Sequence, residues 1–465
     1  MDPNPSYWHR TMLLVSVVLG VVTLVGALVY GWFRPAGVIG DSSKIIADRS
    51  TGALYIVIDH RLHPALNLVS ARLIAGSPDT PTFVSPGEIA KWPKGEPVGI
   101  IGAPIEAPAT LSPQVSRWAV CDTAPTTVGG GPEVTGIDGQ LTFSAAAGEL
   151  GTDDALLLAY DSGHGPQTYL VIGGVRMPVD LTDGVVTTAL GIRPGAPVPP
   201  MSQPLYDALP AEHPLTVPTV PGAGQPAPPE FGLHVPVGAV LAGRDVAAGA
   251  DRFYVVLGDG VQEVSPVTAA MLRGHDSYGQ PAPPYLAPDQ LAKIPARHDL
   301  DIDHYPHNPV HLIDPASRPV TCAAWQWSQT ERQARFTVVS GRGLPIGADQ
   351  QASLVKLVGG GGGVQADQVL VGAEATTFVT STGGALDSPA RGAMWLIAPS
   401  GARYGVPFDD DSLSALGLTA STVRPAPWWA LQVWPAGPEL SKQAALTLHS
   451  PADTAVLPTK TTKGG

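Results

Sequence analysis

The sequence predicts an α+β protein: a single N-terminal transmembrane helix, then a large region of four small strand-turn-strand-helix repeats around a central β-rich domain. Three observations lead to this class. Residues 12–33 form one apolar run without charge. Two kinds of segment then recur in the order A, B, A′, B′. Charged residues make up only 14% of the chain, which holds 53 glycines and 49 prolines, and this composition favours short strands, turns and short helices.

The run at residues 12–33 is long enough to cross a bilayer, because a spanning helix takes about 20 apolar residues. Its few polar side chains, such as Ser16 and Thr23, can be satisfied within a helix. A cleaved signal peptide would need a shorter core and a cleavage site, and a helix packed on a protein surface would show a polar face. Aromatic residues flank the run as they do at membrane interfaces. The expected anchor therefore includes Met12, Tyr30, Trp32 and Phe33.

The charge balance restricts the class of partner. A formal charge of −13 at pH 7 argues against nucleic-acid binding, because no basic stripe is available to neutralise phosphates. Basic residues flank the anchor on both sides, so the positive-inside rule sets no orientation.

Segment type A begins with a strand and recurs far downstream. ALYIVID at residues 53–59 matches RFYVVLG at 252–258, and PTFVSPGEIAKWP at 81–93 matches APPYLAPDQLAKIP at 282–295. In the first copy, Ser85 and Glu88 have capping-box spacing with Pro86 between them, which predicts a short helix.

Segment type B shows the same duplication. YLVIGGVRMP at residues 169–178 matches WLIAPSGARYGVP at 395–407, and each leads to a short helical motif, TALGI or SALGL. Residues 409–411, three aspartates before SALGL, either cap that helix or bind calcium, and the cap is the simpler interpretation. LPAEHPL at 209–215 and WPAGPEL at 434–440 then close the two halves.

These matches predict the domain organisation. Residues 217–236 are rich in proline and glycine and are expected to link the two halves. The expected regions are a short N-terminal segment (1–11), the transmembrane helix (12–33), repeat unit 1 (41–112), the first segment of the central domain (113–162), repeat unit 2 and linker (163–238), repeat unit 3 (239–314), the second segment of the central domain (315–388), repeat unit 4 (389–450) and a flexible tail (451–465).

The two cysteines fit the duplication. Cys121 in RWAVCDTA and Cys322 in VTCAAWQW each lie in the middle segment of one half. They are either two unrelated buried thiols or a disulfide of an oxidising compartment. If the middle segments share a sheet, the cysteines can approach each other, and closing such a loop is worth roughly 5 kcal/mol in the chain model. Residues 153–161 and 366–374 are expected to be matching strands of this middle domain.

The sequence contains few motifs for catalysis. The glycine run at residues 359–363 lacks the following Lys and Ser/Thr of a phosphate-binding loop, so a loop between strands is the better interpretation. GxSxG, HExxH and CxxC motifs do not occur. Residues 297–314 are dense in histidine and aspartate, but their spacing fits no standard metal site and two prolines favour a surface loop. Weak metal candidates are His304, His307 and His311. Neither a catalytic residue nor a cofactor is predicted.

Several motifs together resemble the EccB family, the single-pass membrane component of the mycobacterial-type ESX (type VII) secretion apparatus. They are WFRPAG, GALYIVIDHRLHPALNLVSARLI, SRWAVCDT and PVTCAAW. The most specific is LHPALNLVSARL at residues 62–73, and the resemblance extends from the anchor to about residue 450.

The resemblance implies a structural core subunit of a secretion complex in the inner membrane, with most of the chain periplasmic. It implies a disulfide between Cys121 and Cys322. It also implies partners: EccC, EccD, EccE, the mycosin protease and other EccB copies in a homo-oligomer. An ATPase activity is attributed to the family, but without a nucleotide motif we do not expect an enzyme. Only MDPNPSYWHRT precedes the anchor, where family members carry a longer cytosolic segment, and this weakens the expected contacts with EccC and EccD.

Two other functions compete with this one. The first is a membrane-anchored periplasmic hydrolase, with nucleotides as a candidate substrate class and His304 and His307 as candidate residues. The second is a cell-wall-binding module in which three tryptophans stack on glycans, although burial in the core is the simpler role for them. These tryptophans are Trp428, Trp429 and Trp434.

Overall fold

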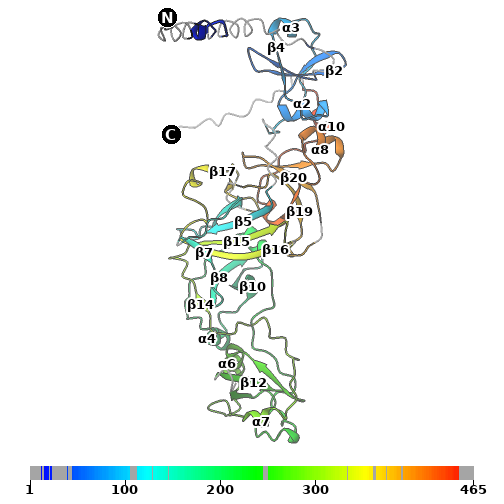
Figure 1. The fold of residues 1–465 in the computed structure, drawn as a ribbon. Coiled ribbons are helices and arrows are strands. Elements are labelled where there is room, and N and C mark those ends of the chain that lie inside the picture. Colours follow the sequence, from blue (N-terminus) through cyan, green and yellow to red (C-terminus); the bar gives the residue numbers. More distant parts are fainter. Residues whose placement is uncertain are drawn as a thin grey trace, which may run out of the picture. The chain divides into compact units, whose positions relative to one another are not determined.

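The computed structural model describes residues 12, 15–19, 21–23, 39, 44–104, 113–127, 129–144, 146–244, 250–331, 333–359, 363–372, 374–388 and 391–449. The chain divides into two compact units. Unit 1 comprises residues 1–107, 407–418 and 438–465, and unit 2 comprises residues 108–406 and 419–437. Figure 1 shows the labelled elements of both.

The described portion of the expected anchor is helical. The Ser16 hydroxyl donates to the carbonyl of Met12, and the Thr23 hydroxyl donates to that of Leu19, both at 2.8 Å. Both polar side chains are therefore satisfied within the helix, as expected. Within the residues that the structure describes, however, none of the helices combines the length and apolarity needed to cross a membrane. Three expected anchor residues lie outside the described residues, namely Tyr30, Trp32 and Phe33.

Unit 1 is built on a four-stranded sheet. Its strands, in spatial order, are β3 (Arg61–Pro64), β2 (Leu54–Ile58), β1 (Ile45–Asp48) and β4 (Thr82–Val84). β4 runs parallel to β1, and the other pairs are antiparallel. Successive side chains point to opposite faces of a strand, so Ile45 and Ile46 enter two different apolar clusters.

Among the described residues after the N-terminal helix, four further helices belong to unit 1. They are α2 (Leu68–Ala75), α3 (Pro86–Ala90), α8 (Asp410–Leu416) and α10 (Lys442–Ala445), and α2 contacts both α8 and α10. α3 begins as expected, with the Ser85 side chain accepting a hydrogen bond from the Glu88 amide. α8 is capped by Asp409, whose carboxylate accepts a hydrogen bond from the Ser412 amide at 2.7 Å. The expected cap is thus confirmed.

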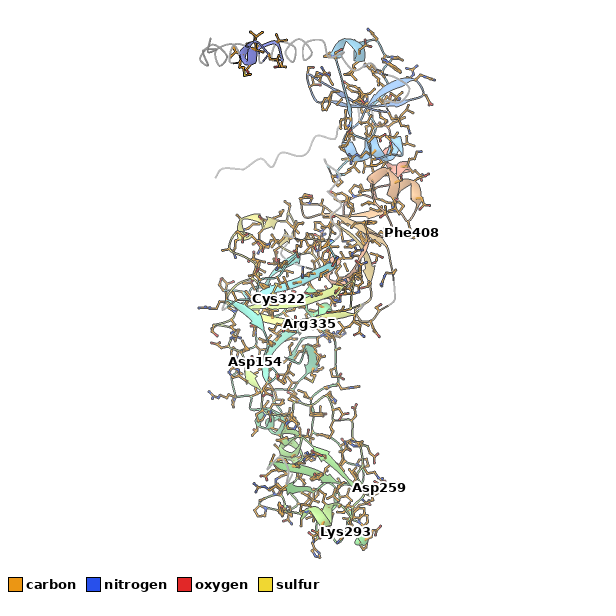
Figure 2. All side chains as sticks on the ribbon, viewed as in Figure 1. Asp154, Asp259, Lys293, Cys322, Arg335 and Phe408 are labelled. Atoms are coloured by element: carbon orange, nitrogen blue, oxygen red, sulfur yellow. A yellow bond between two sulfur atoms is a disulfide. The ribbon has the colours of Figure 1, made fainter. Side chains whose placement is uncertain are left out.

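Unit 2 contains a seven-stranded sheet. Its strands, in spatial order, are β17 (Val355–Lys356), β18 (Gln368–Val371), β6 (Glu133–Asp138), β5 (Val115–Thr123), β15 (Val320–Ser328), β16 (Ala334–Gly341) and β7 (Ala147–Glu149). β5 and β15, one from each half of the chain, pair antiparallel along their whole length. Figure 2 labels Cys322 on β15 and Arg335 on the neighbouring strand β16, where Arg335 lies opposite Gln326. One strand from each half of the chain therefore lies in the same sheet.

The other described strands of unit 2 form three smaller sheets. The first has the order β10 (Val175–Pro178), β9 (Pro166–Ile172), β8 (Asp154–Asp161) and β14 (His311–Leu312). The second consists of β11 (Val240–Arg244), β12 (Asp251–Val256) and β13 (Val261–Val264). The third has the order β21 (Arg403–Val406), β20 (Met394–Ile397), β19 (Phe378–Thr382) and β22 (Arg424–Pro427).

The helices of unit 2 are short. They are α4 (Gly184–Leu190), α5 (Gln203–Ala208), α6 (Pro266–His275), α7 (Pro288–Leu291) and α9 (Trp428–Leu431), with single 3₁₀ turns η1 (Pro229–Phe231) and η2 (Gln351–Ser353). The proline-rich segment at residues 217–236 is folded on itself: the Gly224 amide donates to Val237 and the Val237 amide to Gln225, each at 2.9 Å.

Four groups of elements share one order. Each begins with three antiparallel strands and a helix. An extended segment then pairs in parallel with the first strand. A short helix follows, and after it one residue pairs in parallel with the third strand. The parallel returns to the first strand pair Ile46 with Thr82, Ala159 with Pro200, Ala242 with Tyr285, and Val379 with Arg424. The parallel returns to the third strand pair Leu62 with Lys94, Arg176 with Ala211, Val261 with Ala296, and Arg403 with Ala436.

One expected strand assignment was wrong. Residues 153–161 were expected to lie in the central domain, but β8 pairs with β9 and β14 and belongs to a different sheet from β18. The expected boundary after residue 162 therefore separates two strands of one hairpin. Likewise, β19 precedes the expected boundary at 388 but pairs with β20 and β22.

Candidate functional site

Cys121 and Cys322 form a disulfide at the centre of the seven-stranded sheet. They lie directly opposite each other on β5 and β15, with Cα atoms 3.9 Å apart. Both are fully buried, and the bond joins positions 201 residues apart. Of the two alternatives for the cysteines, the disulfide is the one found.

Two aspartates are buried in the same sheet: Asp122, next to Cys121 on β5, and Asp138 on β6, opposite Trp118. Burial raises the pKa of Asp122 to about 7, although hydrogen bonds from Ser202 act in the opposite direction. Burial likewise raises the pKa of Asp138 to about 8, against one hydrogen bond from the Thr376 amide. The second oxygen of Asp138 has no partner among the described residues. Neither group was predicted from the sequence, because both lie in apolar strands.

The weak metal candidates are not brought together. The His311 Nδ1 lies 2.8 Å from Asp154 Oδ1, at the start of β8, where Figure 2 labels Asp154. His307 is exposed, with its ring near Asn308. His304, in contrast, has a side chain that is only 9% exposed, and it lies beside a residue pair from another region of the chain.

That pair is Glu212 and His213. One ligand atom from each of Glu212, His213 and His304 lies within 4.8 Å of the other two. The centres of the two imidazole rings are 5.5 Å apart. Among the described residues this is the group with the composition and spacing of a metal site. The sequence held a partial signal, because LPAEHPL contains an adjacent carboxylate and imidazole that its counterpart WPAGPEL lacks.

The three tryptophans of the wall-binding alternative do not form one surface. Trp429 and Trp434 are buried in the core of unit 2, as the simpler interpretation expected. Trp428 is 42% exposed, with its ring near Trp395 and the guanidinium of Arg403. A glycan could reach only one of them, so a three-ring stacking site is excluded.

The charged side chains of a polar pocket beside β15 and β16 form ion pairs with one another or with a neighbour. The pocket measures about 230 Å³ and is lined by Arg117, Glu149 and Arg335, among others. These charges are already paired: Arg335 bonds Glu149, and Arg117 bonds Glu374, each at 2.8 Å. Gly359 and Gly363 lie between β17 and β18 with positive φ, as expected for a loop between strands.

Unit 1 exposes apolar side chains on adjacent segments. Ala65 pairs with Val98, which pairs in turn with Leu448. Leu66 follows Ala65, Leu448 is itself paired, and Ile101 lies three residues after Val98. Their exposed fractions are 47%, 57% and 71%. We call these three residues the unit 1 apolar set. Exposed apolar groups that gather on a surface are typical of interaction sites.

Comparisons with known proteins agree on one family. A family model described as "Type VII secretion system ESX-1, transport TM domain B" matches residues 1–453. The ESX-2 secretion system ATPase EccB2 of Mycobacterium tuberculosis is 41% identical over 464 residues, covering 98% of this chain and 91% of the relative. The ESX-3 secretion system ATPase EccB3 of Mycolicibacterium smegmatis is 41% identical over 456 residues, covering 97% and 86%.

Solved structures agree with the sequence relatives. A chain in an intact ESX-5 inner membrane complex has a TM-score of 0.81 at 37% identity, covering 99% of this chain and 92% of that one. A chain in the periplasmic assembly of the ESX-5 complex has a TM-score of 0.80 at 38% identity, covering 92% and 100%. A chain of an EccB3 dimer from the ESX-3 core complex has a TM-score of 0.76 at 39% identity, covering 87% and 100%.

Proposed function

Because the chain belongs to the EccB family of the ESX (type VII) secretion system, we propose that it is a structural core subunit of an ESX inner membrane complex. The observation that carries this proposal is the match, over nearly the whole chain, to a subunit of an intact complex of this kind. Its role is to build the periplasmic portion of the assembly through contacts between subunits.

The proposed location is the inner membrane, with one span and the bulk of the chain in the periplasm. The uncharged run at residues 12–33 supports the span. The buried disulfide supports the periplasm, because such bonds persist in oxidising compartments and are rare in the cytosol.

We further propose that the four groups of elements are four copies of one repeat unit. The matching order of strands, helices and parallel returns supports this, together with the sequence matches between halves. The copies differ in where they lie: the first belongs to unit 1, while the fourth contributes its strands to unit 2 and α8 to unit 1. Repetition gives a chain several similar surfaces for assembly.

The proposed partners are other copies of this chain, the membrane subunits EccC, EccD and EccE, and the mycosin protease. Similarity to a chain of an EccB3 dimer supports contacts between copies. The unit 1 apolar set supplies an accessible surface for such a contact.

We propose that the chain is not itself an ATPase, although its relatives carry that name. The glycine run lacks the lysine and hydroxyl that hold phosphate and magnesium.

Affinity purification of the tagged chain from its native membrane in mild detergent tests the proposal. We expect a very large complex that contains a motor ATPase, and we expect the isolated chain to hydrolyse no ATP above background. A monomer or small homo-oligomer, reproducible across detergents, would overturn the assignment to a secretion complex.

A further inference from the structure

We infer that His213, His304, Glu212 and Asp301 form a binding site for one divalent transition-metal ion of the Zn²⁺ type. The four side chains come from two segments: residues 209–216, which follow α5, and residues 297–310, which follow α7. Two imidazoles with carboxylates are a donor set that zinc uses in proteins.

His304 points most directly to a ligand. Its side chain is only 9% exposed, and neither ring nitrogen has a hydrogen-bond partner among the described residues. A buried imidazole without partners is costly, because its nitrogens have lost water without gaining another partner. A metal ion bound at Nδ1 would satisfy one of them.

Other possible metal-ligand atoms lie near the Nδ1 atom of His304. Asp301 presents one oxygen to each imidazole: Oδ1 lies 3.8 Å from His304 Nδ1, and Oδ2 lies 3.8 Å from His213 Nδ1. His213 Nδ1 also lies 2.9 Å from Glu212 Oε1. Both Nδ1 atoms therefore face carboxylate oxygens.

Zinc binding would require the ligand atoms to move only a short distance, and the side chains that must move are exposed. Ligand atoms around one zinc ion are about 3.3 Å apart when each bond is about 2.0 Å, so the group must contract from its present separation. The side chains of His213 and Asp301 are 69% and 75% exposed, so they can rotate toward a fixed His304. Binding through His213 Nδ1 breaks the hydrogen bond between this nitrogen and Glu212, and the neutral imidazole then carries its proton on Nε2.

Both segments are held in place without the metal. The Tyr305 hydroxyl donates to the Thr216 carbonyl at 2.6 Å, directly linking them. Gln262 bonds both the amide and the carbonyl of Leu300, at 2.8 and 2.9 Å. The Glu212 amide donates to Arg176 on β10 at 3.0 Å. A bound ion would join the second and third groups of elements at a point where the backbone already brings them together.

The test is zinc binding to the full-length chain in detergent, purified with a tag that contains no histidine and stripped with a chelator. Equilibrium dialysis against ZnCl₂ gives the stoichiometry, and Co²⁺ absorption in the visible range reports coordination by nitrogen and oxygen ligands. We expect one Zn²⁺ per chain. His304→Gln and His213→Gln should each weaken binding at least about tenfold.

His307→Gln and His311→Gln are the matched controls, because they remove an imidazole from the same loop outside the cluster. They should bind zinc like the unchanged chain. The double variant Glu212→Gln with Asp301→Asn alters only exposed or half-exposed groups, so it tests the site even if His304→Gln does not fold. Equal loss of zinc in the controls, or no loss in the cluster variants, would overturn the inference, as would less than stoichiometric binding to the unchanged chain.

Discussion

Asp122 on β5 accepts two hydrogen bonds from Ser202, one from its backbone amide and one from its hydroxyl, each 2.6 Å long. Ser202 is also the N-cap of α5, because its Oγ accepts a hydrogen bond from the Leu205 amide. One serine thus fixes the start of a helix and also satisfies a carboxyl group buried in the central sheet.

Ser202→Ala should destabilise the chain by about 2 kcal/mol, since it removes a cap and leaves one oxygen of a buried carboxyl without its donor. Urea denaturation of the full chain measures the change. Ser441→Ala is the matched control, because Ser441 caps α10 through a bond to the Ala444 amide. Its loss should cost about 1 kcal/mol or less. Equal costs would show that the bond to Asp122 contributes nothing.

Asp138 should make the chain less stable as pH rises. Its pKa is raised from 3.8 to about 8 in the folded protein by burial, so between these values the folded chain keeps a proton that the unfolded chain loses. The contribution of Asp138 to the free energy of unfolding is therefore full below about pH 4. It declines by about 1.4 kcal/mol per pH unit up to about pH 8. Asp138→Asn resembles the protonated group and can still accept from the Thr376 amide.

The variant Asp138→Asn should thus show a flatter dependence of unfolding free energy on pH than the unchanged chain. Asp289→Asn serves as the control, since Asp289 is an exposed carboxylate. The same slope for Asp138→Asn and for the unchanged chain would show that Asp138 does not hold a proton in the folded state.

Reduction of the Cys121–Cys322 bond should lower stability by up to about 5 kcal/mol, because the bond closes a long loop and restricts the unfolded chain. Denaturation with and without dithiothreitol measures this. The variant with Cys121→Ala and Cys322→Ala should start from the lower value and should not respond to dithiothreitol. A response in that variant would mean that the reductant acts elsewhere.

Asp409→Ala should cost about 1 kcal/mol through loss of the α8 cap. Asp411→Ala should cost less, because this residue lies in the first turn and contributes only through the helix dipole. Thermal unfolding of both variants, with calcium or with chelator, separates capping from the calcium alternative. A melting temperature that rises with calcium and depends on all three aspartates would favour the cation site.

The unit 1 apolar set should contribute to contacts between copies of the chain. Leu66→Ser with Leu448→Ser removes exposed apolar area from unit 1, so fewer copies should remain associated after purification from the membrane. The mass of the detergent-solubilised complex measures this. Tyr285→Ser, an exposed aromatic on unit 2, should leave the mass unchanged. If both variants behave alike, the contact between copies lies elsewhere.

Local features were predictable from the sequence. The caps at Ser85 and Asp409 follow from residues three or four positions apart, and a helix start needs no distant partner. Cys121 and Cys322 could be matched because the two halves carry similar neighbours around each. The strand at residues 153–161 could not be placed, because an apolar run does not reveal which strand it pairs with.

The candidate metal cluster needed the structure. His304 was visible within a histidine-rich segment, but its neighbours His307 and His311 misdirected the expectation. Its contacts are Glu212 and His213, which served in the sequence only as a marker of duplication. The segment that carries Glu212 and His213 follows a pairing with the third strand of the second group. His304 lies in the partly buried loop that follows the third group. The spacing of residues in the sequence reveals neither arrangement.

The bond between Cys121 and Cys322 makes the intervening chain a covalent ring. The ring contains all of α4 to α7 and the sheets they accompany. A single protease nick within it would leave both fragments tethered through sulfur, so the N-terminal helix would stay attached to α8 and α10. After such a nick, separating the two fragments would require a second event, either reduction of the bond or another cut.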